Sequence, residues 1–352
     1  MCYTWYKERM ADGERSENMI LISFGTRPEY IKIKPLLKAF SKESIDYKLL
    51  LTGQHTDLLS SIEEDVDKLE IIDGDSRLDS IVSSVMNNDH MFDGVDAVLV
   101  QGDTTSAFSI ALAAFHRKIK IIHLEAGLRT YDLLNPYPEE FNRQAISRMS
   151  TINLCPTEES NQNLKSEKVQ GSNYVVGNTV LDNIVGVKPE YTNKVVITMH
   201  RRENHDLIPE WFRKLDEIAK DNKDLEFILP IHPNPNVYKH KDLLRHVKVV
   251  KPMQYDEFIK LLASCKFVIT DSGGLQEESS FFRKKCIVCR KTTERIEGMG
   301  TFAFLCMGTE DLPGLVKWVN DDHIPDEGER CPYGDGKSAE KICKILKERH
   351  GL

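Results

Sequence analysis

Residues 19–36, MILISFGTRPEYIKIKPL, combine the two patterns on which the fold depends. The stretch begins with an apolar run typical of a buried strand, turns at Gly25, and continues with the periodicity of a helix. Arg27 and Lys32 fall in the first turns of that helix, just beyond the end of the strand. Two cations at such a place can form a solvated helix face or an anion-binding site, and this stretch alone does not choose between them.

The alternation of a short apolar run with a longer helical segment repeats along the chain and predicts two parallel sheets with helices on both faces. The polar stretch GVKPEYTN, residues 186–193, interrupts the rhythm and is predicted to link two domains. The strand-like runs are MILISF, YKLLL, DAVLVQ, KIIHLE, INLC and NYVV before this stretch, and KVVITM, EFILPI, VKVV, KFVIT, KCIVC and FAFLC after it.

The length of 352 residues suits two domains of ordinary size, roughly 100–200 residues each, with a cleft between them. We expect an extension over residues 1–18, a first domain over 19–186, a second over 187–334, and a last helix over 335–352 that returns toward the first domain. Ligands of open α/β sheets bind at the carboxyl ends of the parallel strands, so functional residues are expected there.

The composition excludes several classes of protein. With 40% hydrophobic residues, 29% charged residues and a net charge of -8, the chain reads as a mildly acidic globular protein and not as a nucleic-acid-binding protein. No apolar run approaches the roughly 18 residues that cross a bilayer, and the first residues lack the apolar centre of a signal peptide. We therefore expect a cytoplasmic protein with no nucleic-acid or membrane partner, which holds an anionic ligand by local cations.

The eight cysteines are scattered, and the only close pair is Cys286 and Cys289. Both lie in an apolar strand-like run, where alternation points the two thiols away from a shared face. A zinc knuckle would need a second pair, which the sequence lacks. We expect buried, reduced cysteines and no metal site.

The stretch DSGGLQEE, residues 271–278, follows the strand-like run FVIT. Gly273 and Gly274 at a strand-to-helix turn let backbone N–H groups approach a phosphate, and the helix N-terminus adds a favourable dipole. Glu278, about a turn into that helix, could accept hydrogen bonds from both ribose hydroxyls of a nucleotide. An ordinary helix start, with Ser272 as N-cap and acids in the first turn, explains the same residues equally well.

Three carboxylates, Asp103, Glu125 and Glu139, follow or adjoin strand ends in the first domain, which predicts that they converge at one edge of its sheet. Asp103 could instead cap a helix that begins at Thr104. Glu139 and Arg143, four residues apart, could be a surface ion pair worth only about 0.3–0.5 kcal/mol. Pro138 at the predicted helix start favours a rigid placement of Glu139.

His200 follows the first strand of the second domain in the stretch HRREN. A histidine at a strand end is commonly structural, but with Arg201 beside it and a cleft in front it becomes a candidate to stabilise or protonate an anionic leaving group. His232, among the turn-forming prolines of PIHPNPN, reads as a residue that fixes its loop.

Taken together, these segments resemble the UDP-N-acetylglucosamine 2-epimerase family, which has the glycosyltransferase-B type fold of two Rossmann-like, doubly wound parallel-sheet domains. The resemblance runs from about residue 19 to the C-terminus, and the first 18 residues do not match. The motifs that carry it are, in order, GTRPE, TGQH, QGDTT, HLEAGLRT, PYPEEFNR, PTEES, VVGNTVLDN, HRREN, HPNPN, TDSGGLQEE, TTER and PYGDGK.

The resemblance implies that Arg27, Lys32 and His200 face the diphosphate of a UDP-sugar. It places Asp103, Glu125, Glu139 and Arg143 around the sugar. It also implies a substrate-binding set in the second domain, in which Phe258 covers the uracil and Glu278 holds the ribose. In this set Ser272, Gly273, Gly274 and Arg295 bind the phosphate region, and Met253 is the remaining member.

The implied activity is C2 epimerisation of UDP-N-acetylglucosamine by loss of UDP, formation of an enzyme-bound 2-acetamidoglucal and re-addition of UDP. Asp103 and Glu139 are the leading acid/base pair, Glu125 positions or substitutes for them, and His200 with Arg27 stabilises the leaving group. The resemblance calls for no metal and no nicotinamide cofactor, and it favours a homodimer. GTRPEYIK and PYPEE favour the non-hydrolysing branch of the family over the branch that releases N-acetylmannosamine.

Two alternatives from other classes remain. A glycosyltransferase of the same fold would need an open acceptor groove, whereas a catalytically silent sensor would be expected to lack one of the three carboxylates.

In bacterial non-hydrolysing members a second UDP-N-acetylglucosamine acts as an activator, and its site corresponds here to Gln54, Asp57, Arg77, Arg201 and His232. Asp57 stands where a glutamine is usual, which predicts weakened activation.

Overall fold

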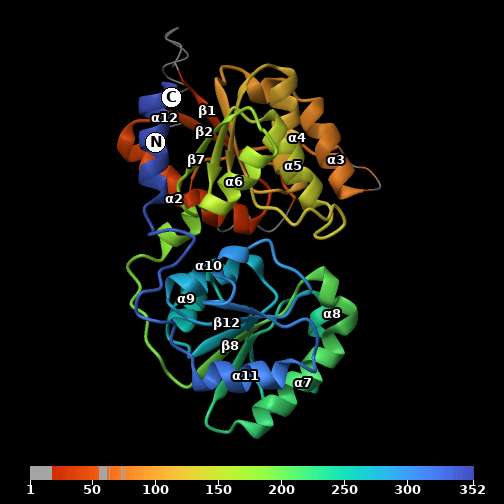
Figure 1. Ribbon diagram of the computed structural model, residues 1–352. Coiled ribbons are helices and arrows are strands. Elements are labelled where there is room, and N and C mark those ends of the chain that lie inside the picture. Colours follow the sequence, from red (N-terminus) through yellow and green to blue (C-terminus); the bar gives the residue numbers. More distant parts are fainter. Residues whose placement is uncertain (1–17, 55–61, 63, 73, 75) are drawn as a thin grey trace. The chain divides into compact units, whose positions relative to one another are not determined.

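The computed structural model describes residues 18–54, 62, 64–72, 74 and 76–352, which divide into two compact units (Figure 1). The first unit contains the described residues up to Asn183 together with Gly336–Leu352, and the second contains Ile184–Asp335. The stretch predicted as a linker, residues 186–193, thus belongs to the second unit. Its Glu190 is tied there because its N–H donates to Ala263 O at 2.9 Å and its carbonyl accepts from Lys284 Nζ.

The sheet of the first unit has seven parallel strands in the order β3-β2-β1-β4-β5-β6-β7. The strands are β1 (Ile20–Phe24), β2 (Tyr47–Leu51), β3 (Asp67–Lys68), β4 (Ala97–Gln101), β5 (Lys120–Leu124), β6 (Ile152–Cys155) and β7 (Ser172–Val175). The helices are α2 (Arg27–Glu43), α3 (Arg77–Met86), α4 (Thr105–His116), α5 (Glu139–Met149), α6 (Glu158–Ser166) and α12 (Ser338–His350), with the short 3-10 helices η2 (His90–Phe92) and η3 (Thr179–Asn183).

The turn from β1 to α2 is compact because a glycine is closely surrounded there and a capping box begins the helix. Gly25 lies so close to its neighbours that an added Cβ would come within 2.5 Å of the hydroxyls of Ser106 and Thr52. Thr26 caps α2, and Glu29 completes a capping box with it. The helix then buries one apolar face, including Ile33 and Phe40, in the core formed with β1.

The sheet of the second unit has six parallel strands in the order β10-β9-β8-β11-β12-β13. They are β8 (Lys194–Thr198), β9 (Glu226–Pro230), β10 (Lys248–Val250), β11 (Phe267–Thr270), β12 (Cys286–Val288) and β13 (Ala303–Leu305). The helices are α7 (Ile208–Asp221), α8 (Pro235–Tyr238), α9 (Tyr255–Ala263), α10 (Gly273–Phe281) and α11 (Leu312–Asp321), with the 3-10 helices η4 (Arg202–Leu207), η5 (Lys241–Leu243) and η6 (Ile296–Gly298).

Both sheets reverse their strand order once, between β1 and β4 in the first unit and between β8 and β11 in the second. Such a switch point opens a crevice at the carboxyl ends of the strands, where open α/β sheets bind ligands. The residues that follow these strands are those singled out from the sequence. The prediction of two doubly wound parallel-sheet domains is confirmed.

The last helix, α12, packs against α2 in the first unit, although it follows the second unit in sequence (Figure 1). Asp182 accepts hydrogen bonds from the backbone N–H groups of Ser338 and Ala339, and so holds the first turn of the helix. Near the other end, Lys347 Nζ lies 3.1 Å from a carboxylate oxygen of Glu43. These contacts fix both ends of the returning helix.

Candidate functional site

Asp103 lies just beyond β4 and is held by α5. Arg143 donates from Nε to Asp103 Oδ2 at 2.9 Å and from Nη2 to the same oxygen, while Asn142 Nδ2 donates to the Asp103 carbonyl at 2.9 Å. The alternative in which Asp103 caps the following helix is wrong, because Thr104 is the N-cap and its side chain accepts from the N–H of Ala107. The structure therefore leaves Asp103 presented at the strand end with its orientation fixed.

Arg143 is a buried residue whose guanidinium also donates to Glu140 Oε2 at 3.0 Å. It is thus directed at Asp103 and Glu140, and the interpretation of Arg143 as half of a surface ion pair is not what the structure shows. Glu139 is the first residue of α5, after Pro138, and its Oε2 is buried. The helix start predicted at this proline is confirmed.

Glu125 follows β5 with a left-handed backbone, φ 66°, which non-glycine residues seldom adopt. Its Oε2 accepts from Lys32 Nζ at 2.5 Å and from Gln101 Nε2. The Lys32 side chain is only 13% exposed, so this lysine does not belong to a solvated helix face. Arg27, the first residue of α2, is exposed. The question raised by the two cations is therefore answered for Lys32, which lies against a carboxylate at the strand ends.

Two further residues position these groups and were not identified from the sequence. Glu29 accepts from the N–H groups of Gly25 and Thr26 at 3.0 and 2.7 Å, and from Thr104 Oγ1 at 2.7 Å. Burial raises the pKa of Glu29, while these hydrogen bonds oppose the rise. The capping-box pattern of Thr26 and Glu29 was the available signal. Glu29 joins the turn after β1 to the turn after β4.

His123 is the second such residue. It lies fully buried on β5, and its Nε2 is 2.8 Å from the carbonyl oxygen of Gly102, the residue before Asp103. Burial lowers the pKa of His123 to about 4, so the ring is neutral near pH 7 and Nε2–H donates to that carbonyl. The turn that carries Asp103 is therefore fixed from the neighbouring strand.

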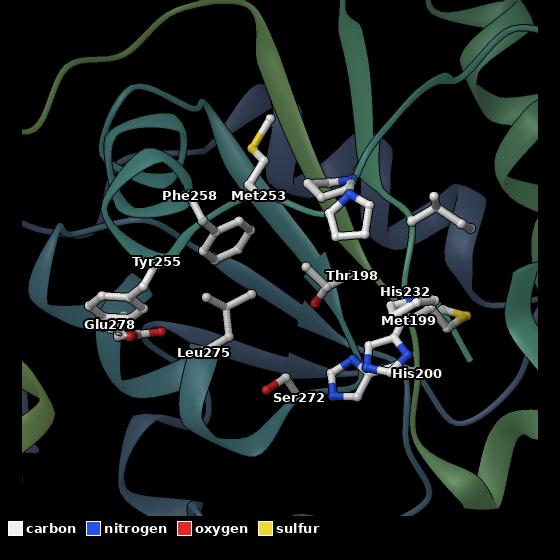
Figure 2. Close-up of a pocket in the computed structure, with 14 residues that line it drawn as sticks. Thr198, Met199, His200, His232, Met253, Tyr255, Phe258, Ser272, Leu275 and Glu278 are labelled. Carbon is white, nitrogen blue, oxygen red and sulfur yellow. Dashed lines mark hydrogen bonds between the residues drawn. The ribbon is translucent and has the colours of Figure 1, made fainter. Parts of the chain in front are cut away.

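The second unit has a pocket of about 270 Å³ at the carboxyl ends of its strands (Figure 2). Most of its wall is apolar, and a few polar side chains point inward, as expected for a ligand site. Phe258 and Leu275 form part of the apolar wall. The lining residues are Thr198, Met199, His200, Pro230, Ile231, His232, Pro233, Pro252, Met253, Tyr255, Phe258, Ser272, Leu275 and Glu278.

One side of the pocket carries a tyrosine and a carboxylate in contact. Tyr255 Oη donates to Glu278 Oε1 at 2.8 Å. Burial, and then the negative charge of Glu278, raise the pKa of Tyr255, so its hydroxyl remains a donor. Sequence reasoning named Glu278 but missed Tyr255, which reads as an ordinary residue at the start of an amphipathic helix.

The histidines lie on the other side of the pocket (Figure 2). The rings of His200 and His232 are stacked, with centroids 5.3 Å apart and planes inclined by 17°. His232 also accepts from the N–H of Asn234 at 3.1 Å, so it both fixes its loop, as predicted, and lines the pocket beside His200. Burial lowers the pKa of His200, although the nearby Asp271 acts to raise it.

Asp271 is the residue that ties this side of the pocket together. It is fully buried at the end of β11 and accepts from the N–H groups of His200 and Arg201, each at 2.9 Å, and from Asn204 Nδ2 at 3.1 Å. His200 Nδ1 lies 3.5 Å from its other oxygen. Sequence reasoning treated Asp271 as part of a turn. An acid directly after a buried strand was the signal that could have identified it.

The start of α10 differs from an ordinary capped helix. Ser272 is the N-cap residue, but in the described structure its side chain makes no capping hydrogen bond. A Cβ on Gly273 would lie 2.8 Å from Arg295 Nη1, so this glycine allows the guanidinium to approach the helix start. Arg295 is buried and donates from Nε to Glu277 Oε1 at 2.8 Å and from Nη1 to Glu294. The predicted phosphate residues are therefore gathered, with Arg295 held by two carboxylates.

Comparison with known proteins identifies the family. A family model described as UDP-N-acetylglucosamine 2-epimerase matches residues 38–347, which is most of the chain. The UDP-N-acetylglucosamine 2-epimerase of Campylobacter jejuni is 37% identical, over 93% of this chain and 97% of that protein. The chain belongs to the UDP-N-acetylglucosamine 2-epimerase family.

Solved structures of 2-epimerases share the fold. The Neisseria meningitidis UDP-GlcNAc 2-epimerase bound to UDP-GlcNAc is 32% identical with a TM-score of 0.83, over 94% of this chain and 100% of that one. The Methanocaldococcus jannaschii UDP-GlcNAc 2-epimerase in complex with UDP-GlcNAc and UDP is 28% identical with a TM-score of 0.77, over 94% and 99%. The predictions of the family and of the glycosyltransferase-B type fold are both confirmed.

Four of the five residues predicted for a 2-epimerase activator site are described. Gln54 accepts from Ser106 Oγ at 3.0 Å, and Arg77 Nη2 donates to the carbonyl of the neighbouring Gly53 at 2.6 Å. Arg201 and His232 belong to the second unit. Asp57, the residue on which weakened activation was predicted, lies outside the described residues.

The described part of this 2-epimerase also bears on metals and membranes. Among its residues, no three or more His, Cys, Asp or Glu side chains are grouped so that they could hold a metal ion. Seven described cysteines are free, and all of them except Cys331 are buried. Within the same ranges, no helix has both the length and the apolar character needed to cross a bilayer.

Proposed function

We propose that this protein interconverts UDP-N-acetylglucosamine and UDP-N-acetylmannosamine by eliminating UDP and adding it back. The observation that carries the proposal is a pair of carboxylates at the strand ends of the first unit, Asp103 and Glu125, each held by a cation. A third carboxylate, Glu139, begins α5, the helix whose Arg143 holds Asp103. A glycosyltransferase of the same fold has no need of such a set. The relatives named as 2-epimerases support the same substrate.

The nucleotide is assigned to the pocket of the second unit. Phe258 and Met253 offer an apolar surface for the uracil, and Glu278 offers a carboxylate to the ribose hydroxyls. The N-terminus of α10 at Ser272–Gly274 offers backbone N–H groups and a favourable dipole to the diphosphate. Arg295, which is paired with Glu277 and Glu294, places its guanidinium close to Gly273. This assignment uses a pocket with a mostly apolar wall and a few convergent polar groups.

The chemistry is assigned to the first unit and to His200. Loss of UDP from C1 and of the proton from C2 gives a 2-acetamidoglucal, and protonation of C2 from the opposite face followed by re-addition of UDP gives the epimer. Asp103 and Glu139 are the proposed acid/base pair, with Arg143 orienting Asp103 and with Glu125 as a positioning group or alternative base. Arg27, Lys32 and His200 are proposed to stabilise the charge that grows on the departing diphosphate.

Lys32 connects binding of the diphosphate with the chemistry at the sugar. In the structure it lies against Glu125, so a diphosphate that attracts the lysine competes with that carboxylate. Weakening the ion pair leaves Glu125 available to the sugar. Substrate binding is thereby linked to the availability of a carboxylate at the reacting carbon.

The experiment that tests this function is a proton NMR time course with UDP-N-acetylglucosamine in deuterium oxide. The proposal expects deuterium at C2 and accumulation of UDP-N-acetylmannosamine. Free N-acetylmannosamine with UDP would indicate the hydrolysing branch, and transfer of the sugar only after an acceptor is added would indicate a glycosyltransferase. Bound but unchanged substrate, with C2 unexchanged, would indicate a sensor.

The proposed partner is a second copy of the chain. Large apolar side chains are exposed around the start of α5, namely Tyr131, Leu133, Leu134, Tyr137 and Phe141. Burying them between two copies would remove apolar area from water. Analytical ultracentrifugation should show a dimer that Leu134→Glu weakens, and a monomeric wild-type protein would contradict this assignment. The cytoplasmic location expected from the sequence stays a prediction.

A further inference from the structure

The pair formed by Tyr255 and Glu278 has a consequence for which nucleotides the pocket accepts. Tyr255 is the first residue of α9 and Glu278 lies in α10, so the contact joins two helices of the second unit. Figure 2 shows the tyrosine ring beside the carboxylate, on the side of the pocket away from His200 and His232. Both side chains line the pocket, and Glu278 is only 7% exposed.

The hydroxyl of Tyr255 limits how the carboxylate can turn. Oε1 of Glu278 accepts from Tyr255 Oη at 2.8 Å, a normal length for an O–H···O hydrogen bond. A glutamate side chain has several rotatable bonds, and fixing them before a ligand arrives removes an entropic cost from binding. The tyrosine thus holds the acceptor in one orientation at the pocket wall.

We propose that Tyr255 is a positioning residue that acts through Glu278 and makes the pocket selective for ribonucleotides over 2′-deoxyribonucleotides. The inference rests on the proposed function, in which Glu278 receives the ribose. A ribose presents two adjacent hydroxyl donors to an acceptor held in place, whereas a 2′-deoxyribose leaves part of that acceptor unsatisfied. Sites built around a substrate hydroxyl reject the analogue that lacks it for this reason.

Without the tyrosine hydroxyl the carboxylate loses one of the contacts that orient it and can turn more freely. It can then adjust to a single ribose hydroxyl or to water, so the analogue is penalised less, while UDP loses the benefit of the fixed orientation. Both changes act in the same direction on selectivity. The ratio of the two affinities should therefore fall, which a tyrosine that only packed against the helix would not cause.

The test measures the binding of UDP and of 2′-deoxy-UDP by titration calorimetry to wild type, Tyr255→Phe and Tyr191→Phe. Tyr191→Phe is the matched control, because it removes another hydrogen-bonded tyrosine hydroxyl of the second unit. Tyr191 donates to Arg283 O at 2.6 Å and does not line the pocket. We expect wild type to prefer UDP by about tenfold or more, which is about 1.4 kcal/mol. We expect Tyr255→Phe to reduce this preference by about threefold or more and the control to keep it.

A second pair of variants tests whether the tyrosine acts through the carboxylate. In the background of Glu278→Ala, which removes the acceptor of the tyrosine hydroxyl, adding Tyr255→Phe should change the preference for UDP by less than it does in wild type, since interacting residues are not additive. In turnover of the UDP-sugar, Tyr255→Phe should raise KM and leave kcat nearly unchanged. Equal effects of Tyr255→Phe in both backgrounds would overturn the inference.

The outcomes separate this inference from the proposed function. If wild type binds UDP without preference over 2′-deoxy-UDP, or if Tyr255→Phe keeps the wild-type preference, the inference is overturned and the proposed function stands. If wild type binds neither nucleotide, both are overturned. If Tyr255→Phe lowers the affinities for both nucleotides by the same factor, the inference is also overturned, because the tyrosine would then support the pocket as a whole.

Discussion

Replacing His123 by asparagine should remove a large part of the acid sensitivity of the first unit. His123 is fully buried, and its Nδ1, the atom that would bind a second proton, has no acceptor among the described residues for the N–H that would form. Its pKa is lowered from 6.5 to about 4, mainly by burial. In the unfolded chain the ring would titrate near 6.5.

The direction of the effect follows from these two values. Because the pKa is lower in the folded state, the unfolded state binds more protons below about pH 6.5, and protonation favours unfolding. The stability associated with neutral His123 is present above that pH and is lost as the pH falls toward 4. The difference between 6.5 and about 4 corresponds to roughly 3 kcal/mol, at about 1.4 kcal/mol for each pH unit.

The assay is urea unfolding followed by far-UV circular dichroism at several pH values from 7 to 4. At pH 7 wild type should be more stable than His123→Asn by about 1–2 kcal/mol, because the variant loses the hydrogen bond to Gly102 O. Wild type should lose about 3 kcal/mol relative to the variant by pH 4, so the difference should change sign and the variant should be the more stable protein by about 1–2 kcal/mol. Comparing the two proteins cancels the other titrating groups. Of the three tryptophans, Trp211 and Trp318 lie in the second unit, so fluorescence in a Trp5→Phe background follows that unit separately.

The control is Thr52→Val, which removes a buried, hydrogen-bonded hydroxyl from the same unit and no titratable group. Its stability difference from wild type should be the same at pH 7 and pH 4. A difference between wild type and His123→Asn that does not change with pH would refute the reasoning, since it would mean that His123 accepts its proton as easily when folded as when unfolded.

Three further predictions concern the proposed reaction. Asp103→Asn and Glu139→Gln should each lower turnover by about 100-fold or more while UDP still binds by calorimetry, and turnover like that of wild type would remove the residue from the acid/base pair. Asp57→Gln should strengthen activation of the reverse reaction by trace UDP-N-acetylglucosamine. The substitution removes a negative charge, and repulsion between such a charge and a diphosphate costs on the order of 1 kcal/mol at a separation of about 4 Å. An unchanged activation curve would show that Asp57 does not weaken the site. Turnover should persist after dialysis against a chelator, and its loss there would contradict a metal-free reaction.

The strands could be predicted almost completely from the sequence. Each of the twelve apolar runs corresponds to a strand, because strands buried in a parallel sheet need continuous apolar residues. The missed strand, β3, consists of Asp67 and Lys68, which are exposed and are held by backbone pairing at the edge of the sheet. Two polar residues carry no periodic signal, so only the folded neighbour β2 reveals this strand.

The placement of candidate residues could be predicted where they follow a strand end, as for Asp103, Glu125 and His200, while their roles stay predictions. The residues that hold these groups were missed because their partners are distant in sequence. Tyr255 meets Glu278 across 23 positions, and Asp271 meets His200 across 71. Such contacts depend on which strands become neighbours, and that is decided by the packing of the whole sheet.

The most direct test of the central claim, that UDP is eliminated and added back, follows the bond between C1 of the sugar and the oxygen that bridges it to the phosphate. UDP-N-acetylglucosamine labelled with oxygen-18 at that bridging position is incubated with the enzyme, and recovered substrate is analysed by phosphorus NMR. Elimination of UDP makes the oxygens of the terminal phosphate equivalent, so the account predicts label in non-bridging positions at a rate comparable to epimerisation. Epimerisation with the label retained wholly in the bridge would contradict it.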